Sequence, residues 1–99
     1  MLFRSQLLGK WVSDPEDKEG RREFGTVTLE FRENGELTYS IRGHEKEQRI
    51  FLTYAVEDGM IVTDQPSQPH QERTAYSLTS DGRLTLWFGG QRSVYVRGQ

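Results

Sequence analysis

Residues 27–41 read VTLEFRENGELTYSI, two alternating runs of apolar and polar side chains on either side of an Asn-Gly pair. Alternation with a period of two is typical of a β-strand that buries one face. A three-residue loop, Glu33-Asn34-Gly35, would place Phe31 opposite Leu37, so that the apolar residues of both runs share one face. We therefore predict a β-hairpin closed by a type I turn and a left-handed glycine.

The same pattern recurs towards the C-terminus. Asp58-Gly59 and Asp81-Gly82 also lie between alternating runs, and we predict the same three-residue turn at both, with a fourth at residues 89–91. The glycine that ends each of the first three loops, Gly35, Gly59 or Gly82, should then have a positive φ. This turn type sets the following residues opposite each other: Val56 and Met60, Leu78 and Leu84, and Leu86 and Val94.

These runs, together with a strand near Trp11, predict an all-β fold of about eight short antiparallel strands. A small up-and-down barrel is favoured over a two-sheet sandwich, because short sequential hairpins form a simple meander and closure removes both exposed edges. No window has a helical period, and the charged segment 14–23 is expected to be a surface loop. The 99 residues are expected to form one domain, spanning residues 1–99.

Composition narrows the classes of function. There is no cysteine, so the chain has no thiolate chemistry and no disulfide. With 13 basic and 15 acidic residues mixed along the chain, no basic stripe for nucleic acid emerges. No apolar run reaches the roughly 20 residues of a membrane span, and residues 1–8 are too short and too interrupted for a signal peptide. We expect a soluble, cytoplasmic protein, with export left open, that binds neither nucleic acid nor membrane.

Aromatic side chains dominate the expected inner face of the barrel. They form a candidate ligand site in which tyrosine hydroxyls would orient the polar end of a small apolar molecule. The alternative is that these rings, with Phe31 and the aliphatic residues, simply fill the barrel, since an eight-stranded barrel is just wide enough for either. The candidate ligand-binding residues are Trp11, Tyr39, Tyr54, Tyr76 and Phe88.

Four further apolar residues, Phe51, Ile61, Trp87 and Tyr95, fall on the expected outer face. A contiguous patch of such residues would mark a partner surface or a homodimer interface. In the expected register Trp87 and Tyr95 stand one diagonal step apart. The alternative is that the N-terminal segment, with Leu2, Phe3 and Leu7, covers some of them.

No motif predicts catalysis, a metal or a cofactor. Asp64, Ser67 and His70 have the residue types of a hydrolase triad, but they share one Pro-rich loop without a nucleophile elbow, so ordinary turn formation explains them better. His44 with Glu45 and Glu47 offers too few ligands for a metal centre, and a solvated turn explains it better.

The opening Gly9-Lys10-Trp11 matches the G-x-W motif at the start of the lipocalin fold. The chain resembles the compact bacterial lipocalin-like domains of the calycin group, and the resemblance covers the whole chain in strand order. It implies that Trp11 lies at the closed end of the barrel beneath a basic residue of the last strand, Arg97 or, second, Arg92. The chain departs from typical lipocalins in its shortness and in lacking their cysteines and C-terminal helix.

Two functions are therefore expected, and neither is enzymatic. The first, implied by the resemblance, is a lipocalin-like module that binds a small apolar or amphipathic molecule. The second is a structural or protein-interaction domain with a filled core that acts through its outer aromatic surface.

Overall fold

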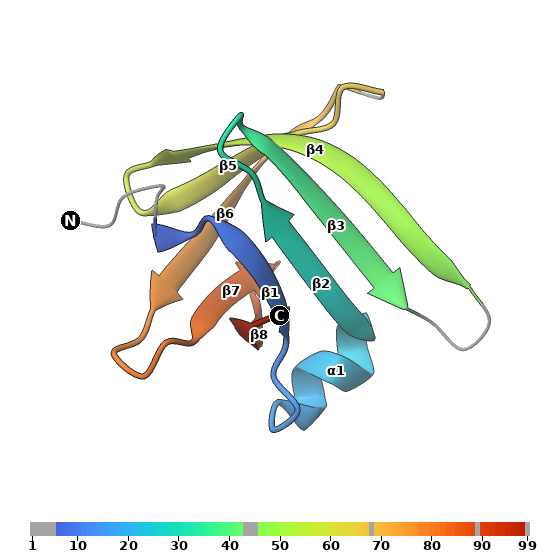
Figure 1. Cartoon of the computed structure of the whole chain (residues 1–99), viewed down its shortest axis with the longest axis vertical. Coiled ribbons are helices and arrows are strands. Elements are labelled where there is room, and N and C mark those ends of the chain that lie inside the picture. The colour runs from blue at the N-terminus through green and yellow to red at the C-terminus, as the bar shows by residue number, and fades with distance from the viewer. Residues whose placement is uncertain (1–5, 43–45, 68, 89, 99) are drawn as a thin grey trace.

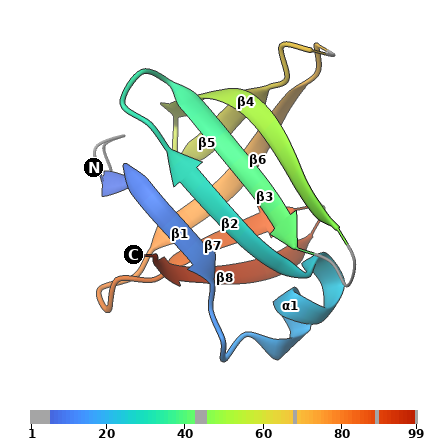
Figure 2. The same ribbon diagram turned by 45° about the vertical axis from the view of Figure 1, so that its right-hand side comes forward.

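A computed structural model describes residues 6–42, 46–67, 69–88 and 90–98, apart from the side chains of Glu23, Phe24 and Phe88. The described residues form one closed, antiparallel, up-and-down barrel, and the short helix α1 lies against one end of it (Figures 1 and 2). The all-β, eight-stranded barrel expected from the alternation is confirmed. Its elements are β1 (Gly9–Ser13), α1 (Lys18–Phe24), β2 (Thr26–Phe31), β3 (Glu36–Arg42), β4 (Glu47–Glu57), β5 (Met60–Asp64), β6 (Gln71–Leu78), β7 (Leu84–Phe88) and β8 (Gln91–Arg97).

Closure occurs between the first and last strands. Trp11 of β1 lies opposite Arg97 of β8, and Ser13 lies opposite Tyr95. Each strand pairs with its neighbours in chain order, and β1 pairs with β8, so the sheet closes on itself. The strands β2, β3 and the first half of β4 pair along their lengths, whereas β5 pairs only with the second half of β4, from Thr53 onwards.

The predicted turn is confirmed at two hairpins. Phe31 lies opposite Leu37, and Leu78 lies opposite Leu84, as a three-residue loop requires. Gly35, Gly59 and Gly82 all have the predicted positive φ, at 89°, 73° and 85°.

At the other two hairpins the predicted register is wrong by one residue. Glu57 lies opposite Met60 and Leu86 opposite Ser93, so each loop has two residues instead of three. In the first of these loops Asp58 also has a positive φ, 49°, which gives the two-residue turn whose twist matches that of the strands. Both shifts turn the following strand over: Ile61 and Tyr95 face the core, whereas Met60, Val62, Val94 and Val96 were expected there.

The segment after β1 contains a helix where a loop was expected. Asp17 caps α1, with its Oδ1 accepting from the Gly20 amide at 3.1 Å, and its Oδ2 accepts from the Val94 amide of β8 at 2.8 Å. The helix was missed because its seven residues are mostly charged and carry no apolar stripe. Asp17 stabilises it by capping its N-terminus while bonding it to the barrel wall.

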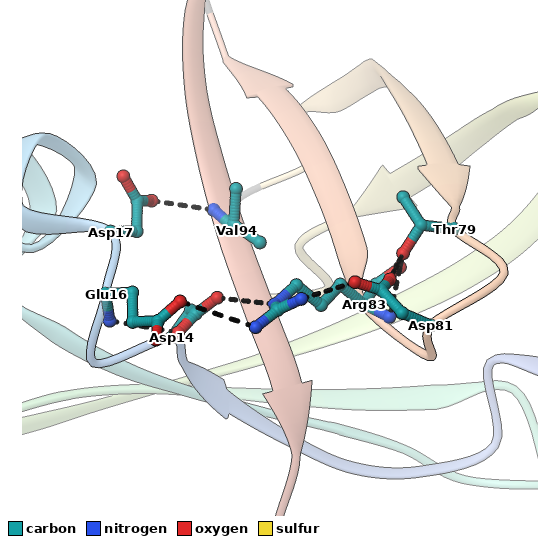
Figure 3. Close-up of polar contacts among 7 residues, drawn as sticks. All are labelled: Asp14, Glu16, Asp17, Thr79, Asp81, Arg83 and Val94. Carbon is teal, nitrogen blue, oxygen red and sulfur yellow. Dashed lines mark hydrogen bonds and ion pairs between the residues drawn. The ribbon is translucent and has the colours of Figure 1, made fainter.

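Arg83 also holds the segment that links β1 to α1 (Figure 3). Its side chain reaches across the strand that carries Val94, and its Nε lies 2.8 Å from Oδ2 of Asp14, a carboxylate that is almost fully buried. It also pairs with Glu16 and Asp81. Hydrogen bonds from Thr79 and Arg83 hold the pKa of Asp81 below its usual range. Arg83 thus joins the β6–β7 hairpin to the chain that leaves β1.

The end of the barrel opposite α1 is closed by the segment that precedes β1. Leu7 is fully buried there, and its carbonyl accepts a hydrogen bond from Trp11 Nε1 at 2.9 Å. The Arg97 guanidinium lies over the Trp11 ring, with its Cζ 4.0 Å from the ring centroid. The predicted burial of Trp11 beneath Arg97 is confirmed. Gly9, with φ 112°, permits this contact, because a Cβ there would lie 3.0 Å from an Arg97 nitrogen.

Candidate ligand cavity

The barrel contains a cavity of about 240 Å³ between β2–β3–β4 on one side and β5–β6–β7 on the other. Its walls are mainly apolar, because most of the inward-facing residues of these strands are aliphatic or aromatic. The apolar lining residues are Leu29, Phe31, Leu37, Ile50, Leu52, Ile61 and Leu86, and Tyr39 also lines the cavity. The hydroxyl residues Thr63 and Thr74 also line it.

The polar lining residues gather where β5 ends and β6 begins. Gln65, His70 and Glu72 line the cavity there, with Gln65 half-buried and the other two exposed. His70 Nε2 lies 2.8 Å from Oε1 of Glu72. The backbone amide of His70 donates to Oδ1 of Asp64 at 3.0 Å, and this bond ties the two ends of the loop together. The cavity is therefore an apolar space with a polar mouth, the usual form of a site for a small amphipathic molecule.

Strand phase explains why His70 and Glu72 face the mouth. Thr74 and Tyr76 of β6 are buried, and Glu72 precedes Thr74 by two residues, so it points to the same face. His70 continues that phase one step before the strand begins. His70 was not among the predicted ligand-binding residues, although it lines the cavity. Extending the alternation backwards from Thr74 was the signal that could have found both residues.

The five residues predicted to surround a ligand are only partly brought together. Tyr39 lines the cavity. Trp11, Tyr54 and Tyr76 are buried as part of the packed core, and they are not among the lining residues. Tyr54 packs edge-on against Phe31, with ring centroids 5.0 Å apart, and its hydroxyl donates to the Arg32 carbonyl at 2.9 Å. The side chain of Phe88 lies outside the part of the chain that is described.

Burial raises the pKa of three tyrosine hydroxyls inside the barrel. It raises the pKa of the Tyr39 hydroxyl, and it raises the pKa of Tyr95 much further, despite a hydrogen bond of 3.0 Å from Ser93. The pKa of Tyr76 is also raised by burial, and its hydroxyl finds no hydrogen-bond partner among the described residues. These hydroxyls are therefore neutral at physiological pH, so any charge at the cavity comes from its mouth.

The predicted outer aromatic surface is not formed. Ile61 and Tyr95 are 3% and 1% exposed and belong to the core, because the two-residue turns reverse the faces of β5 and β8. The predicted pairing of Trp87 with Tyr95 on one outer face is therefore wrong. Phe51 and Trp87 are exposed, at 64% and 39%, but they lie on β4 and β7, which are separated by β5 and β6. Of the proposed covering residues, Leu2 and Phe3 lie outside the described residues, and Leu7 is buried in the core beside Trp11.

Within the described ranges, no group of three or more His, Cys, Asp or Glu residues could hold a metal ion. His44, considered above for a metal, lies outside them. No helix in the described part of the chain is both long enough and apolar enough to cross a membrane. No protein-family model, curated protein or solved structure compared with the chain matches it.

Proposed function

We propose that this chain is a lipocalin-like, non-enzymatic module that binds a small apolar or amphipathic molecule in the barrel cavity. One observation carries the proposal: a space of about 240 Å³ lined mainly by apolar residues has Gln65, His70 and Glu72 together at one place on its rim. An apolar chain gains free energy by leaving water for such a wall, and polar groups at the mouth let its hydrophilic end remain hydrogen-bonded.

The cavity volume restricts the ligand's size. Drug-sized ligands occupy pockets of roughly 300–1,000 Å³, so this cavity suits something smaller. At roughly 30 Å³ for a group the size of a water molecule, about 240 Å³ holds about eight non-hydrogen atoms. A short alkyl chain or a single substituted ring has this size.

The contact between Arg97 and Trp11 supports the lipocalin-like part of the proposal. The resemblance drawn from Gly9-Lys10-Trp11 implied a basic residue of the last strand over this tryptophan, and Arg97 lies there. The contact lies where β1 begins and β8 ends, away from the polar lining residues where β5 ends and β6 begins.

Methyl NMR with 1-pentanol to 1-octanol tests the proposal. The chain has three isoleucines, of which Ile50 and Ile61 line the cavity, whereas Ile41 packs against the core without lining it. We expect saturable shifts of the Ile50 and Ile61 methyl signals, with a much smaller shift at Ile41. No shift with any alcohol, or equal shifts at all three, would contradict the proposal.

A blocked cavity provides the matched comparison. Leu52 is half-buried and lines the cavity, so Leu52→Trp should fill part of it and weaken binding by at least about tenfold, the scale of one lost apolar contact of about 1.4 kcal/mol. Phe51→Trp adds the same ring one residue away, at an exposed position on the outer face, and should bind as the wild type does. Equal binding by both variants would place the ligand elsewhere.

A further inference from the structure

Negative charge exceeds fixed positive charge among the described residues that line the cavity mouth. The lining residues that the structure describes include one carboxylate, Glu72, and no lysine or arginine. When the His70 imidazole is neutral in this position, its Nε2–H donates a hydrogen bond to the Glu72 carboxylate. Its Nδ1 then remains free to act as an acceptor. With His70 in that form, the pair keeps the full negative charge of Glu72 and offers acceptors to a ligand.

The nearest cation on the same strand is directed away from this mouth. Arg73 follows Glu72 on β6 and therefore faces outwards, where its Nη2 lies 3.7 Å from Oε2 of Glu57 on β4. On the first half of β4, Arg49 likewise alternates with the cavity residue Ile50 and pairs with Glu47 at 3.7 Å. Neither arginine is placed to neutralise Glu72 from within the cavity.

We propose that the mouth selects the ligand's head group, and that the ligand class is small alkyl or aryl amines bound as ammonium ions. The inference rests on the function proposed above and names the ligand of that same site. An ammonium group has three donors and no acceptor, so it complements the Glu72 carboxylate and the acceptor nitrogen of His70. Its apolar part would extend between Ile50, Ile61 and Leu86. A carboxylate head at the same place would meet the charge of Glu72.

Three probes of equal chain length test the selection: octylamine, 1-octanol and octanoate. They are compared at pH 8, where an alkylamine still carries its charge. The Ile50 and Ile61 methyl signals report binding. We expect octylamine to bind at least about threefold more tightly than 1-octanol, and octanoate to bind more weakly than 1-octanol, as a partly exposed ion pair allows.

Glu72→Gln isolates the carboxylate. On this variant, octylamine should bind to within about twofold of 1-octanol, because the amide keeps the side chain's size and removes its charge. Glu30→Gln removes the same charge from another exposed strand position, which pairs with Arg32 at 3.4 Å on the outer face, and should keep the preference for the amine. This control separates a local effect of Glu72 from the net charge of −2.

The outcomes distinguish this inference from the proposed function. Equal binding of the three probes, or a preference for octanoate, would overturn the amine assignment while leaving the cavity as a binding site. An amine preference that survives Glu72→Gln would overturn the role of Glu72 in selecting the head group. Absence of binding by all three probes, together with the shorter alcohols, would overturn both.

Discussion

The Arg97 guanidinium covers the Trp11 ring at 4.0 Å and also donates hydrogen bonds to the carbonyl oxygens of Gln6 and Leu8. One side chain thus joins β8, β1 and the segment that precedes β1. A guanidinium can do this because its flat face stacks on an aromatic ring while its nitrogens donate in the plane. The ammonium of lysine has no such face.

Replacing this arginine tests how much the contact stabilises the barrel. Arg97→Lys keeps the charge but loses the stacking and the forked hydrogen bonds, and we expect the free energy of unfolding to fall by about 1–2 kcal/mol. Urea unfolding followed by circular dichroism measures it. Arg49→Lys, at an exposed ion pair with Glu47, should change the value by less than about 0.5 kcal/mol. Equal losses in the two variants would show that the stacking contributes nothing.

Gly20 is needed for the way Asp17 is used. A Cβ at position 20 would collide with the Asp17 carboxylate, which accepts hydrogen bonds from the amides of Gly20 and Val94. Alanine normally stabilises a helix by about 1 kcal/mol relative to glycine. Here we expect Gly20→Ala to destabilise the protein by about 1 kcal/mol, because it displaces the cap and its bond to β8.

Lys18→Ala is the matched control for that change, since Lys18 is exposed on the same short helix. It should alter stability by less than about 0.5 kcal/mol in urea unfolding. If Gly20→Ala instead raised stability, as helix propensity alone predicts, the two bonds of Asp17 would be of no energetic importance.

Burial of Tyr95 predicts a loss of stability in alkali. Its pKa is raised in the folded chain, whereas an unfolded tyrosine loses its proton near pH 10. Above that pH the unfolded state binds fewer protons, so the free energy of unfolding falls as pH rises, by about 1.4 kcal/mol per pH unit for each such phenol. Tyr39 and Tyr76 shift in the same direction.

Tyr95→Phe removes one of these phenols and should flatten the decline by about 1.4 kcal/mol per pH unit. Urea unfolding at several pH values between 9 and 12 measures the slope, which reaches its full size about one unit above the unfolded pKa of about 10. Phenolate absorbance shows when the remaining tyrosines ionise. A variant with the same slope as the wild type would mean that Tyr95 ionises without unfolding.

How much of the fold could be predicted depended on whether successive residues differ in polarity. Leu29 and Phe31 alternate with charged and hydroxyl residues, so only one face of β2 could be buried, and the register followed. Met60-Ile61-Val62 and Val94-Tyr95-Val96 are continuous apolar runs, in which either face could be the inner one. In these runs the length of the preceding turn decides which face is buried. The turn predicted there was one residue too long, so Ile61 and Tyr95 were assigned to the outer face instead of the core.

The candidate site was predicted less well than the barrel for a related reason. Alternation identifies the inner face of a strand, but it does not say which inward residues pack tightly and which border a space. Tyr54 fills the core against Phe31, whereas Tyr39 borders the cavity, and nothing in their local sequence separates them. The mouth depends on Gln65 and His70, which approach it through a loop whose path follows no period.

The two-residue turn at Asp58-Gly59 can be tested by its backbone demands. Asp58 has a φ of 49°, a conformation that aspartate and asparagine tolerate and β-branched residues avoid. We expect Asp58→Val to lower the free energy of unfolding by roughly 1–2 kcal/mol, and Asp58→Asn to leave it unchanged or slightly higher. In the three-residue turn, position 58 would have a negative φ and valine would be tolerated. Equal stabilities of the two variants would therefore favour that turn and return Ile61 to the outer face.

Two buried tyrosines offer a matched pair with opposite expected signs. The Tyr76 hydroxyl has no hydrogen-bond partner among the described residues, whereas the Tyr54 hydroxyl donates to the Arg32 carbonyl at 2.9 Å. A buried polar group without a partner costs about 1–3 kcal/mol, and a made hydrogen bond contributes about 1 kcal/mol. Tyr76→Phe should therefore raise the free energy of unfolding by about 1 kcal/mol, and Tyr54→Phe should lower it by a similar amount.

Each change removes one oxygen and keeps the ring, including the edge-on contact of Tyr54 with Phe31. Packing is thus nearly constant across the pair, and the difference in urea unfolding isolates the hydroxyl. A loss of stability in Tyr76→Phe would mean that this hydroxyl does form a hydrogen bond in solution. Its partner would then be a polar group inside the barrel in addition to Thr74.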